Sequence, residues 1–347
     1  MKAKVIYFLM LLLSITGFIG CKNGKARTLT GATGAPFEVL LVASNSVLDS
    51  KAGKELKEVL QSPMPGLPQA EPEFKVSVIP TPHFDNIVKP VRNILMVDID
   101  STRYTQPKFS FAKDVWSDGQ VVLYLKAPSI KSLESFIPAN EQIIIDFFVN
   151  CELNRVVKVL SKNYNKKAAE EMYDLLGVEM NLPAEFISTK KGENFYWISN
   201  SSPVERFDVV VYSVPYNDIN AFTAENIIAR RDSVMKANIP GAYEGTYMKT
   251  SKSIVPEYKT LNVGGKFAAE VRGLWEVEGD AMGGPFVSLT RLDEINNRII
   301  TAEIFIFSPE KKKRNALRRL EASLYTLRLN QENMLPEVPV TIEQNKK

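Results

Sequence analysis

Short apolar runs and longer amphipathic segments alternate along the chain, which is the pattern expected of strands separated by helices. The first half predicts strands at 37–43, 74–79, 93–98 and 120–125, a helix at 47–61 ended by Pro65-Gly66, and a helical region at 127–176. The second half predicts strands at 207–213, 266–277, 286–292 and 299–307, a helix at 222–237 ended by Pro240-Gly241, and a last helix at 308–329. We therefore expect an α+β fold, an α/β sandwich of two similar halves, each with helices packed on a mainly antiparallel or mixed sheet.

The order of the elements and their Pro-Gly stops recur at a similar spacing in the two halves, which suggests an internal duplication. Two unrelated α/β segments remain the alternative, because proline and glycine end helices in any fold. We expect an N-terminal α/β domain at 37–176 and a C-terminal α/β domain at 177–329. The polar segment 330–347, which contains Pro336 and Pro339, predicts a disordered tail.

Charged residues in two elements are predicted to face solvent. Strand 266–277 alternates apolar and charged positions, so Glu270 and Arg272 are expected on the exposed face of an antiparallel strand. The last helix carries a leucine stripe that predicts docking on a sheet, and its start carries six basic residues, Lys311, Lys312, Lys313, Arg314, Arg318 and Arg319. We expect these six to lie on a solvated face, with binding of anionic lipid headgroups as the alternative.

The first 21 residues have the pattern of an export signal. Lys2 and Lys4 precede an apolar run at 5–18, which is shorter than the about 20 residues of a membrane-spanning helix. The run leads into Gly20-Cys21 and resembles the lipobox of bacterial lipoproteins. The resemblance implies a signal peptide at 1–20 and a diacylglyceryl group, with palmitate, on Cys21 that anchors the chain to a membrane of the cell envelope. The following segment, 21–36, predicts a flexible tether, and its lack of an acidic run favours the periplasmic side.

Composition limits the classes of function. Hydrophobic residues make up 45% of the chain and charged residues 24%, which is typical of a globular protein with a buried core. The formal net charge is +3 and the two signs are interleaved, so we expect no nucleic-acid partner. Lipidation of Cys21 would leave Cys151 as the second of two cysteines without a partner. Because Cys151 lies in an apolar part of a predicted helix, we expect it to be a buried core residue and not a nucleophile.

A metal site is the main candidate for catalytic chemistry. Asp98 and Asp100 project to the same side at the end of a predicted strand, and carboxylate pairs of this kind can bind a divalent cation. His83 is the single histidine of the chain and lies in the preceding connection. These three residues define the alternative hypothesis, a metal-assisted hydrolase. A strand that leaves the core and meets water would show the same Asp-x-Asp pattern.

Tryptophans are the candidate ligand-binding residues. Trp116, Trp197 and Trp275 could line a groove for a sugar or a peptide, because their rings combine a large contact area with a polar N–H group. Most tryptophans of α/β domains are instead part of the core or its rim.

Several motifs together resemble one family. They are the lipobox, Pro-Ala-Glu-Phe at 183–186, Phe-Tyr-Trp at 195–197 and the apolar strand ending at Pro215. They resemble a Bacteroidota lipoprotein family catalogued as a domain of unknown function, DUF4837, over nearly the whole chain. This resemblance implies an envelope location and no particular activity, cofactor or site. The second half is also similar, in pattern only, to the sandwich of photosystem P-type subunits.

We therefore expect a lipid-anchored cell-envelope protein, facing the periplasm, with a non-catalytic binding or scaffold role and no cofactor. The expected partners are the membrane, through the N-terminal lipid, and an envelope protein or glycan that the sequence does not identify.

Overall fold

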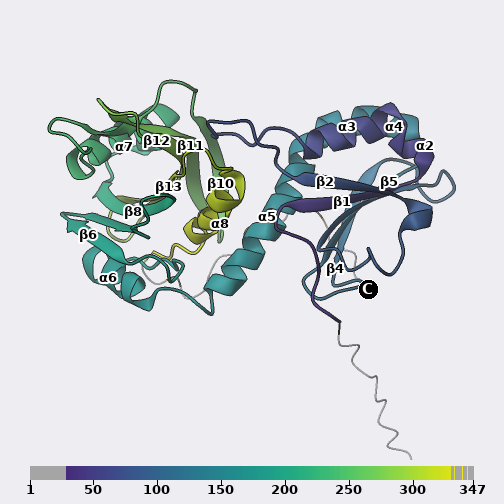
Figure 1. Ribbon diagram of the computed structural model, residues 1–347, viewed down its shortest axis with the longest axis horizontal. Helices are drawn as coiled ribbons and strands as arrows, with labels where there is room; N and C mark the ends of the chain where they lie inside the picture. Colours follow the sequence, from purple (N-terminus) through teal and green to yellow (C-terminus); the bar gives the residue numbers. More distant parts are fainter. Residues whose placement is uncertain (1–28, 330–331, 333–337, 339–341, 343–347) are drawn as a thin grey trace, which may run out of the picture. The chain divides into compact units, whose positions relative to one another are not determined.

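The computed structural model describes residues 29–329, 332, 338 and 342 (Figure 1). Cys21 and the predicted signal peptide lie outside the described residues. Within the described part, no helix is long and apolar enough to cross a membrane.

The first sheet has five strands in the order β2-β1-β3-β5-β4. Strands β2, β1, β3 and β5 pair in parallel, and β4 adds an antiparallel edge to β5. The strands are β1 (Glu38–Ala43), β2 (Lys75–Pro80), β3 (Asn93–Ile99), β4 (Lys108–Lys113) and β5 (Val121–Ala127). The helices of this part are α2 (Asn45–Leu48), α3 (Lys51–Leu60), η2 (Thr81–His83), α4 (Ile130–Phe136), η3 (Pro138–Asn140) and α5 (Glu141–Leu160).

Strand β1 is apolar at consecutive positions because both of its faces are buried. Val39 and Leu41 belong to one buried cluster, whereas Leu40 and Val42 belong to another on the opposite face of the sheet. A parallel strand that is covered on both faces needs hydrophobic residues at every position.

The second sheet is antiparallel throughout, in the order β10-β11-β12-β13-β8-β7-β6, and β9 pairs with the end of β11 (Figure 1). The strands are β6 (Ser188–Gly192), β7 (Phe195–Ser199), β8 (Arg206–Pro215), β9 (Tyr247–Thr250), β10 (Glu257–Val263), β11 (Lys266–Glu278), β12 (Gly283–Asp293) and β13 (Arg298–Phe307). The helices of this part are α6 (Lys166–Leu176), η4 (Ile219–Phe222), α7 (Ala224–Asn238) and α8 (Arg314–Leu324). Helix α6, which the sequence pattern groups with the first half, contacts β7 and β8 of this sheet.

Polar side chains set several helix starts. Ser50, Ser129, Asn165 and Thr223 each accept a hydrogen bond from a backbone N–H in the first turn of α3, α4, α6 and α7, respectively. These caps satisfy N–H groups that have no partner within the helix. Helix α6 ends at Gly177, whose φ of 64° is the left-handed conformation that favours glycine.

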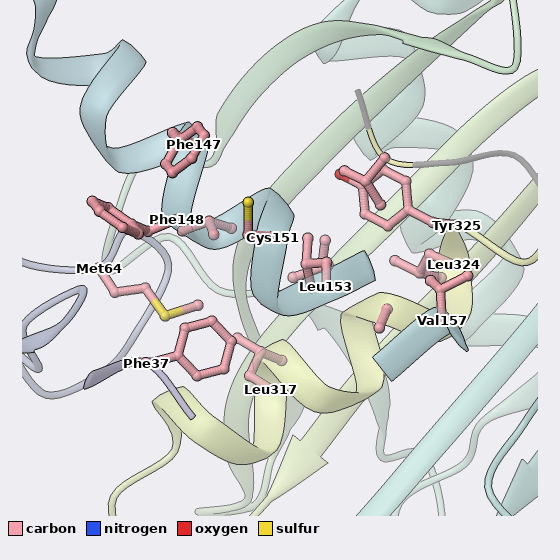
Figure 2. Packing of buried hydrophobic residues seen from close by; sticks show 14 of the residues in the cluster. Phe37, Met64, Phe147, Phe148, Cys151, Leu153, Val157, Leu317, Leu324 and Tyr325 are labelled. Atoms are coloured by element: carbon pink, nitrogen blue, oxygen red, sulfur yellow. The ribbon is translucent and has the colours of Figure 1, made fainter. Parts of the chain in front are cut away.

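Helix α5 and helix α8 share a hydrophobic core. Figure 2 shows Phe147, Phe148, Cys151, Leu153 and Val157 of α5 in the same cluster as Leu317 and Leu324 of α8. The leucine stripe of α8 is therefore buried, as the sequence predicts. The core continues from these helices onto residues of both sheets.

The α+β fold is confirmed. The strands of the two sheets account for about 35% of residues and the helices for about 29%. The two halves nevertheless differ in topology. The strand at 37–43 is paired in parallel, whereas the strand at 207–213 lies between two antiparallel neighbours. The two halves thus differ in strand direction at this position, and Pro-Gly stops end helices in either topology.

Both chain ends have defined neighbours where they are described. In the predicted tether, Gly31 forms a bridge with Asp118 and Thr33 with Val91. In the predicted tail, Val338 is buried, and its backbone exchanges two hydrogen bonds of 2.9 Å with the side chain of Asn154.

Cys151 is buried, as expected, and burial raises the pKa of its thiol to about 11. In a Cys21→Ala variant, where Cys151 is the single thiol, we expect native protein at pH 8 to react with iodoacetamide at least about a hundredfold more slowly than unfolded protein. Mass spectrometry of the alkylated chain measures both rates. Equal rates would contradict the buried position.

Candidate functional site

The charged face of β11 is buried at its centre. Glu270 and Arg272 are only 3% and 4% exposed, so the expectation of a solvated face is wrong for these two residues. The side chain of Glu321, on helix α8, contacts this face through Arg272. Strand alternation shows which residues share a face, but it does not show whether a helix covers that face.

Helix α8 supplies two further charges, Arg318 and Glu321, which are also buried. Nη1 of Arg318 lies 3.1 Å from both carboxylate oxygens of Glu321. Nη2 of Arg272 donates to Glu321 at 2.7 Å and to Glu270 at 3.1 Å. The prediction that the basic residues of this helix face solvent is therefore wrong for Arg318, as it is for the buried Lys313.

A loop from the first half completes the cluster. The backbone hydrogen bonds from Met64 N to Glu71 O and from Glu73 N to Ser62 O, both 2.8 Å, close the loop 62–73. The carboxylate oxygens of Glu73 accept hydrogen bonds from Nη2 of Arg318 at 2.9 and 3.0 Å. We refer to Glu73, Glu270, Arg272, Arg318 and Glu321 as the buried ion cluster.

Glu71, two residues before Glu73, explains how α8 tolerates basic residues at its start. Its carboxylate accepts hydrogen bonds from the backbone N–H groups of Lys313, at 2.5 Å, and Arg314, at 3.3 Å. Lys313 provides no side-chain cap of its own. A negative charge at a helix N-terminus also interacts favourably with the helix dipole.

The pKa shifts favour the ionised forms of Arg272, Arg318 and Glu321. Burial by itself lowers the pKa of Arg272 and Arg318, but neighbouring glutamates outweigh that effect and the net shift of both is upward. Burial by itself raises the pKa of Glu321, but the charges of Arg272 and Arg318 reverse the shift, and its pKa is lowered. Burial also raises the pKa of Tyr325, whose hydroxyl donates to Glu270.

A cavity of about 410 Å³ borders the cluster. Its buried wall contains Glu73, Glu270, Arg272 and Arg318, which we call the inner wall. Its more exposed rim includes Asp146 of α5 and Glu257, Tyr258 and Lys259 of β10. We refer to this space as the ion-lined cavity.

Gly66 fits closely against the cluster. A Cβ atom at this position would lie 2.6 Å from Cγ of Arg272, and the φ of Gly66 is +75°. Glycine therefore allows both the turn of the loop and the close approach of the Arg272 side chain.

Some polar groups at the ion-lined cavity lack a protein partner within the described part of the chain. Nη1 of Arg272 and Nε of Arg318 have no hydrogen-bond partner among the described residues. Asp146 and Glu257, on the rim, form no ion pair with any described residue. Asp146 does accept a hydrogen bond from Gln142. Buried N–H groups without a partner are costly, so a ligand or water that accepts from Arg272 would be stabilised there.

The predicted metal residues have protein partners. Oδ2 of Asp98 accepts a hydrogen bond from Tyr104 at 2.6 Å and lies 3.4 Å from Nη1 of Arg103. Asp100 accepts hydrogen bonds from the backbone N–H and the hydroxyl of Thr102. His83 lies in η2, and the described residues contain no group of three or more His, Cys, Asp or Glu that could hold a metal ion. The two aspartates share an ion-pair partner in Arg103, but the structure does not assemble a metal site with His83.

The three predicted tryptophans do not share a groove. Trp116 packs against Phe84 beside the first sheet, and Trp275 is buried against Phe305 in the second. Trp197 donates from Nε1 to Asp208 at 2.8 Å. Trp275 borders a cavity of about 620 Å³, which neither of the other two tryptophans lines.

The buried ion cluster was not predictable from local sequence patterns, because its members come from three separate segments. One signal was present: Arg318 and Glu321 are spaced i, i+3, and each directly follows a leucine of the buried stripe, Leu317 or Leu320. Nothing in the sequence pairs these residues with Glu73.

The buried ion cluster yields a stability prediction. Replacing Arg318 with Met should lower the free energy of unfolding by about 3–5 kcal/mol, because it leaves Glu73 buried without its ion-pair partner and removes one of the two partners of Glu321. The matched control is Arg319→Met, since Arg319 is exposed and pairs with the exposed Glu185; its loss should cost at most about 1 kcal/mol. Urea unfolding followed by circular dichroism measures both, and equal losses would contradict the assignment.

Two different family models match the two halves of the chain. Residues 32–161 match the model of a domain of unknown function, DUF8532. Residues 165–326 match that of a second domain of unknown function, DUF4837. The expected resemblance to DUF4837 is therefore confirmed, but over the second half and not over nearly the whole chain.

Other similarities are distant, and no curated protein matches the chain. Among solved structures, a substitution mutant of the protein Mog1 is 10% identical, with a TM-score of 0.28, and the match covers 44% of this chain and 90% of that one. The Ran-binding protein Mog1p of Saccharomyces cerevisiae is 13% identical, with a TM-score of 0.27, over 43% and 86% of the two chains. The two family models thus match successive parts of the chain that do not overlap.

Proposed function

We propose that this protein is a lipid-anchored component of the cell envelope that faces the periplasm and acts by binding a ligand or partner. The anchor rests on the basic start, the short apolar run and Cys21, which together resemble the signal and lipobox of bacterial lipoproteins. The resemblance to Bacteroidota lipoproteins supports the same location.

The observation that carries the binding role is the inner wall of the ion-lined cavity. A volume of about 410 Å³ is within the range of small-molecule sites, about 300–1,000 Å³. Its charged side chains are held by one another, which fixes their positions before a ligand arrives. Nη1 of Arg272 is buried and has no hydrogen-bond partner among the described residues, so a ligand group that reached it would satisfy a buried donor.

The same contacts favour binding over catalysis. A general base needs an available oxygen and a pKa near the working pH. Glu321 and Glu73 each direct both carboxylate oxygens to Arg318. The lowered pKa of Glu321 makes it a weak base.

The lining indicates a polar ligand. The cavity presents charges of both signs, and Asp146 and Glu257 lack an ionic partner among the described residues. A glycan or a polar segment of an envelope protein offers the hydroxyl, carbonyl or amine groups that such a wall can bind.

The anchor is tested by metabolic labelling with radioactive palmitate. Label should appear in the wild-type chain and be lost in Cys21→Ala, because the thiol is the acylation site. Cys151→Ala is the matched control and should keep the label, since its thiol is buried. Equal labelling of the two variants would rule out the anchor.

The cavity is tested by photo-crosslinking in cells. A benzophenone amino acid in place of Tyr258, on the rim, should give a discrete adduct that Asp146→Asn and Glu257→Gln weaken. The same substitution at Tyr243, which is 69% exposed and does not line the cavity, is the control. Absence of an adduct at Tyr258, or identical adducts at both positions, would contradict binding at this cavity.

A further inference from the structure

A second cavity, of about 350 Å³, lies where the turn between β7 and β8 meets β6 and β13. Four serines and one arginine provide its polar lining, namely Ser188, Ser199, Ser201, Ser202 and Arg206. The remaining lining residues are Pro203, Met282 and Phe307, so this lining has no carboxylate. We refer to it as the serine-arginine cavity.

The hydroxyl groups of this cavity are arranged as donors. Oγ of Ser199 accepts a hydrogen bond from Ser201 N at 3.3 Å, and Oγ of Ser202 accepts one from Glu205 N at 3.2 Å. Each hydroxyl therefore uses a lone pair within the turn and keeps its own O–H to donate. Ser188 and Ser201 are exposed, and within the described chain their hydroxyls have no hydrogen-bond partner.

Arg206 adds a positive charge in a fixed position. Its Nε and Nη2 lie 3.1 and 3.0 Å from Oδ1 of Asp208, and its guanidinium carbon lies 5.2 Å from the centre of the Trp197 ring. Nη1 has no partner among the described residues, and the side chain is 35% exposed. Asp208 is itself held by the indole N–H of Trp197.

We infer that the serine-arginine cavity binds a small oxyanion, a sulfate or a phosphate group, through Arg206 and the serine hydroxyls. The cavity offers up to four O–H donors and a guanidinium, and its lining contains no carboxylate. Asp208, outside the lining, takes Nε and Nη2 of Arg206 and leaves Nη1 for the anion. Tetrahedral oxyanions present only acceptors, and hydrogen bonds between charged groups are the stronger ones. The ion-lined cavity, with charges of both signs, has no such preference.

Asp208 gives this site a distinctive pH dependence. Burial raises the pKa of Asp208 to about 6, against the opposing effects of Arg206 and Trp197. Above that pH its negative charge offsets Arg206; below it the carboxyl is neutral, so anion affinity should rise as the pH falls through about 6. The other charged groups nearby are Lys190, 5.8 Å from the Trp197 ring centre, and the ion pair of Glu205 with Lys311.

The test follows the indole N–H resonance of Trp197 by NMR while sodium sulfate replaces sodium chloride at constant ionic strength. Sulfate does not titrate in this range, so a pH effect belongs to the protein. We expect a saturable shift whose dissociation constant is smaller at pH 5 than at pH 7.5. Asp208→Asn should remove this pH dependence and bind at pH 7.5 about as tightly as wild type at pH 5.

Arg206→Gln should weaken sulfate binding at least about tenfold, which is the loss expected for a charged hydrogen bond. Arg103→Gln is the control, because Arg103 pairs with Asp98 away from the cavity, and it should bind like wild type. If Arg206→Gln does not fold, Ser188→Ala and Ser201→Ala, at exposed positions, should each weaken binding about threefold. A linear, non-saturable shift, or equal affinity in wild type and Arg206→Gln, would overturn the inference.

A second arm identifies the source of the oxyanion. Phosphatidylcholine vesicles with and without phosphatidic acid are sedimented with the Cys21→Ala chain. Binding that requires both phosphatidic acid and Arg206 indicates a lipid phosphate. Sulfate binding without such sedimentation indicates a soluble oxyanion.

Discussion

The ion pairs of Arg318 are the constraint on which the arrangement of the chain depends. This guanidinium joins Glu73 of the loop 62–73 to Glu321 of α8, and Glu321 in turn holds Arg272 of β11. Burying a charge costs several kcal/mol unless an opposite charge with good geometry accompanies it. The loop, the helix and the strand must therefore occupy one arrangement, since any displacement would leave a buried charge without its partner. Glu71 reinforces the same arrangement by capping α8 from the same loop.

This arrangement also creates the ion-lined cavity. The arginines and glutamates of its inner wall pair with one another, which fixes their positions. The serine-arginine cavity differs in kind, because its hydroxyls keep their donors and its lining holds one positive charge. The ion-lined cavity suits a polar ligand with both donor and acceptor groups, and the serine-arginine cavity suits an oxyanion.

Local patterns predicted much of the fold. The apolar runs of β1, β3, β5, β8 and β13, the amphipathic helices and the burial of Cys151 all follow from composition and periodicity over a few residues. The position of Asp98 and Asp100 at one strand end was also predictable, but the strand pattern did not reveal their partners Arg103 and Tyr104. The different strand directions of the two halves were not predictable, because proline and glycine report where helices stop and carry no information on strand direction.

By itself, the sequence determined the class of fold, the positions of most elements and the signal-like start with Cys21. These are properties of short segments, because the size and polarity of neighbouring side chains decide whether a few residues form a helix, a strand or a turn. Only the tertiary structure decided that Glu270, Arg272 and Arg318 are buried, because their partners lie far away in the chain: Glu73 is separated from Arg318 by 245 residues. A charged residue at an alternating position looks solvated until a distant segment covers it and supplies the opposite charge, and both cavities depend on contacts of this long-range kind.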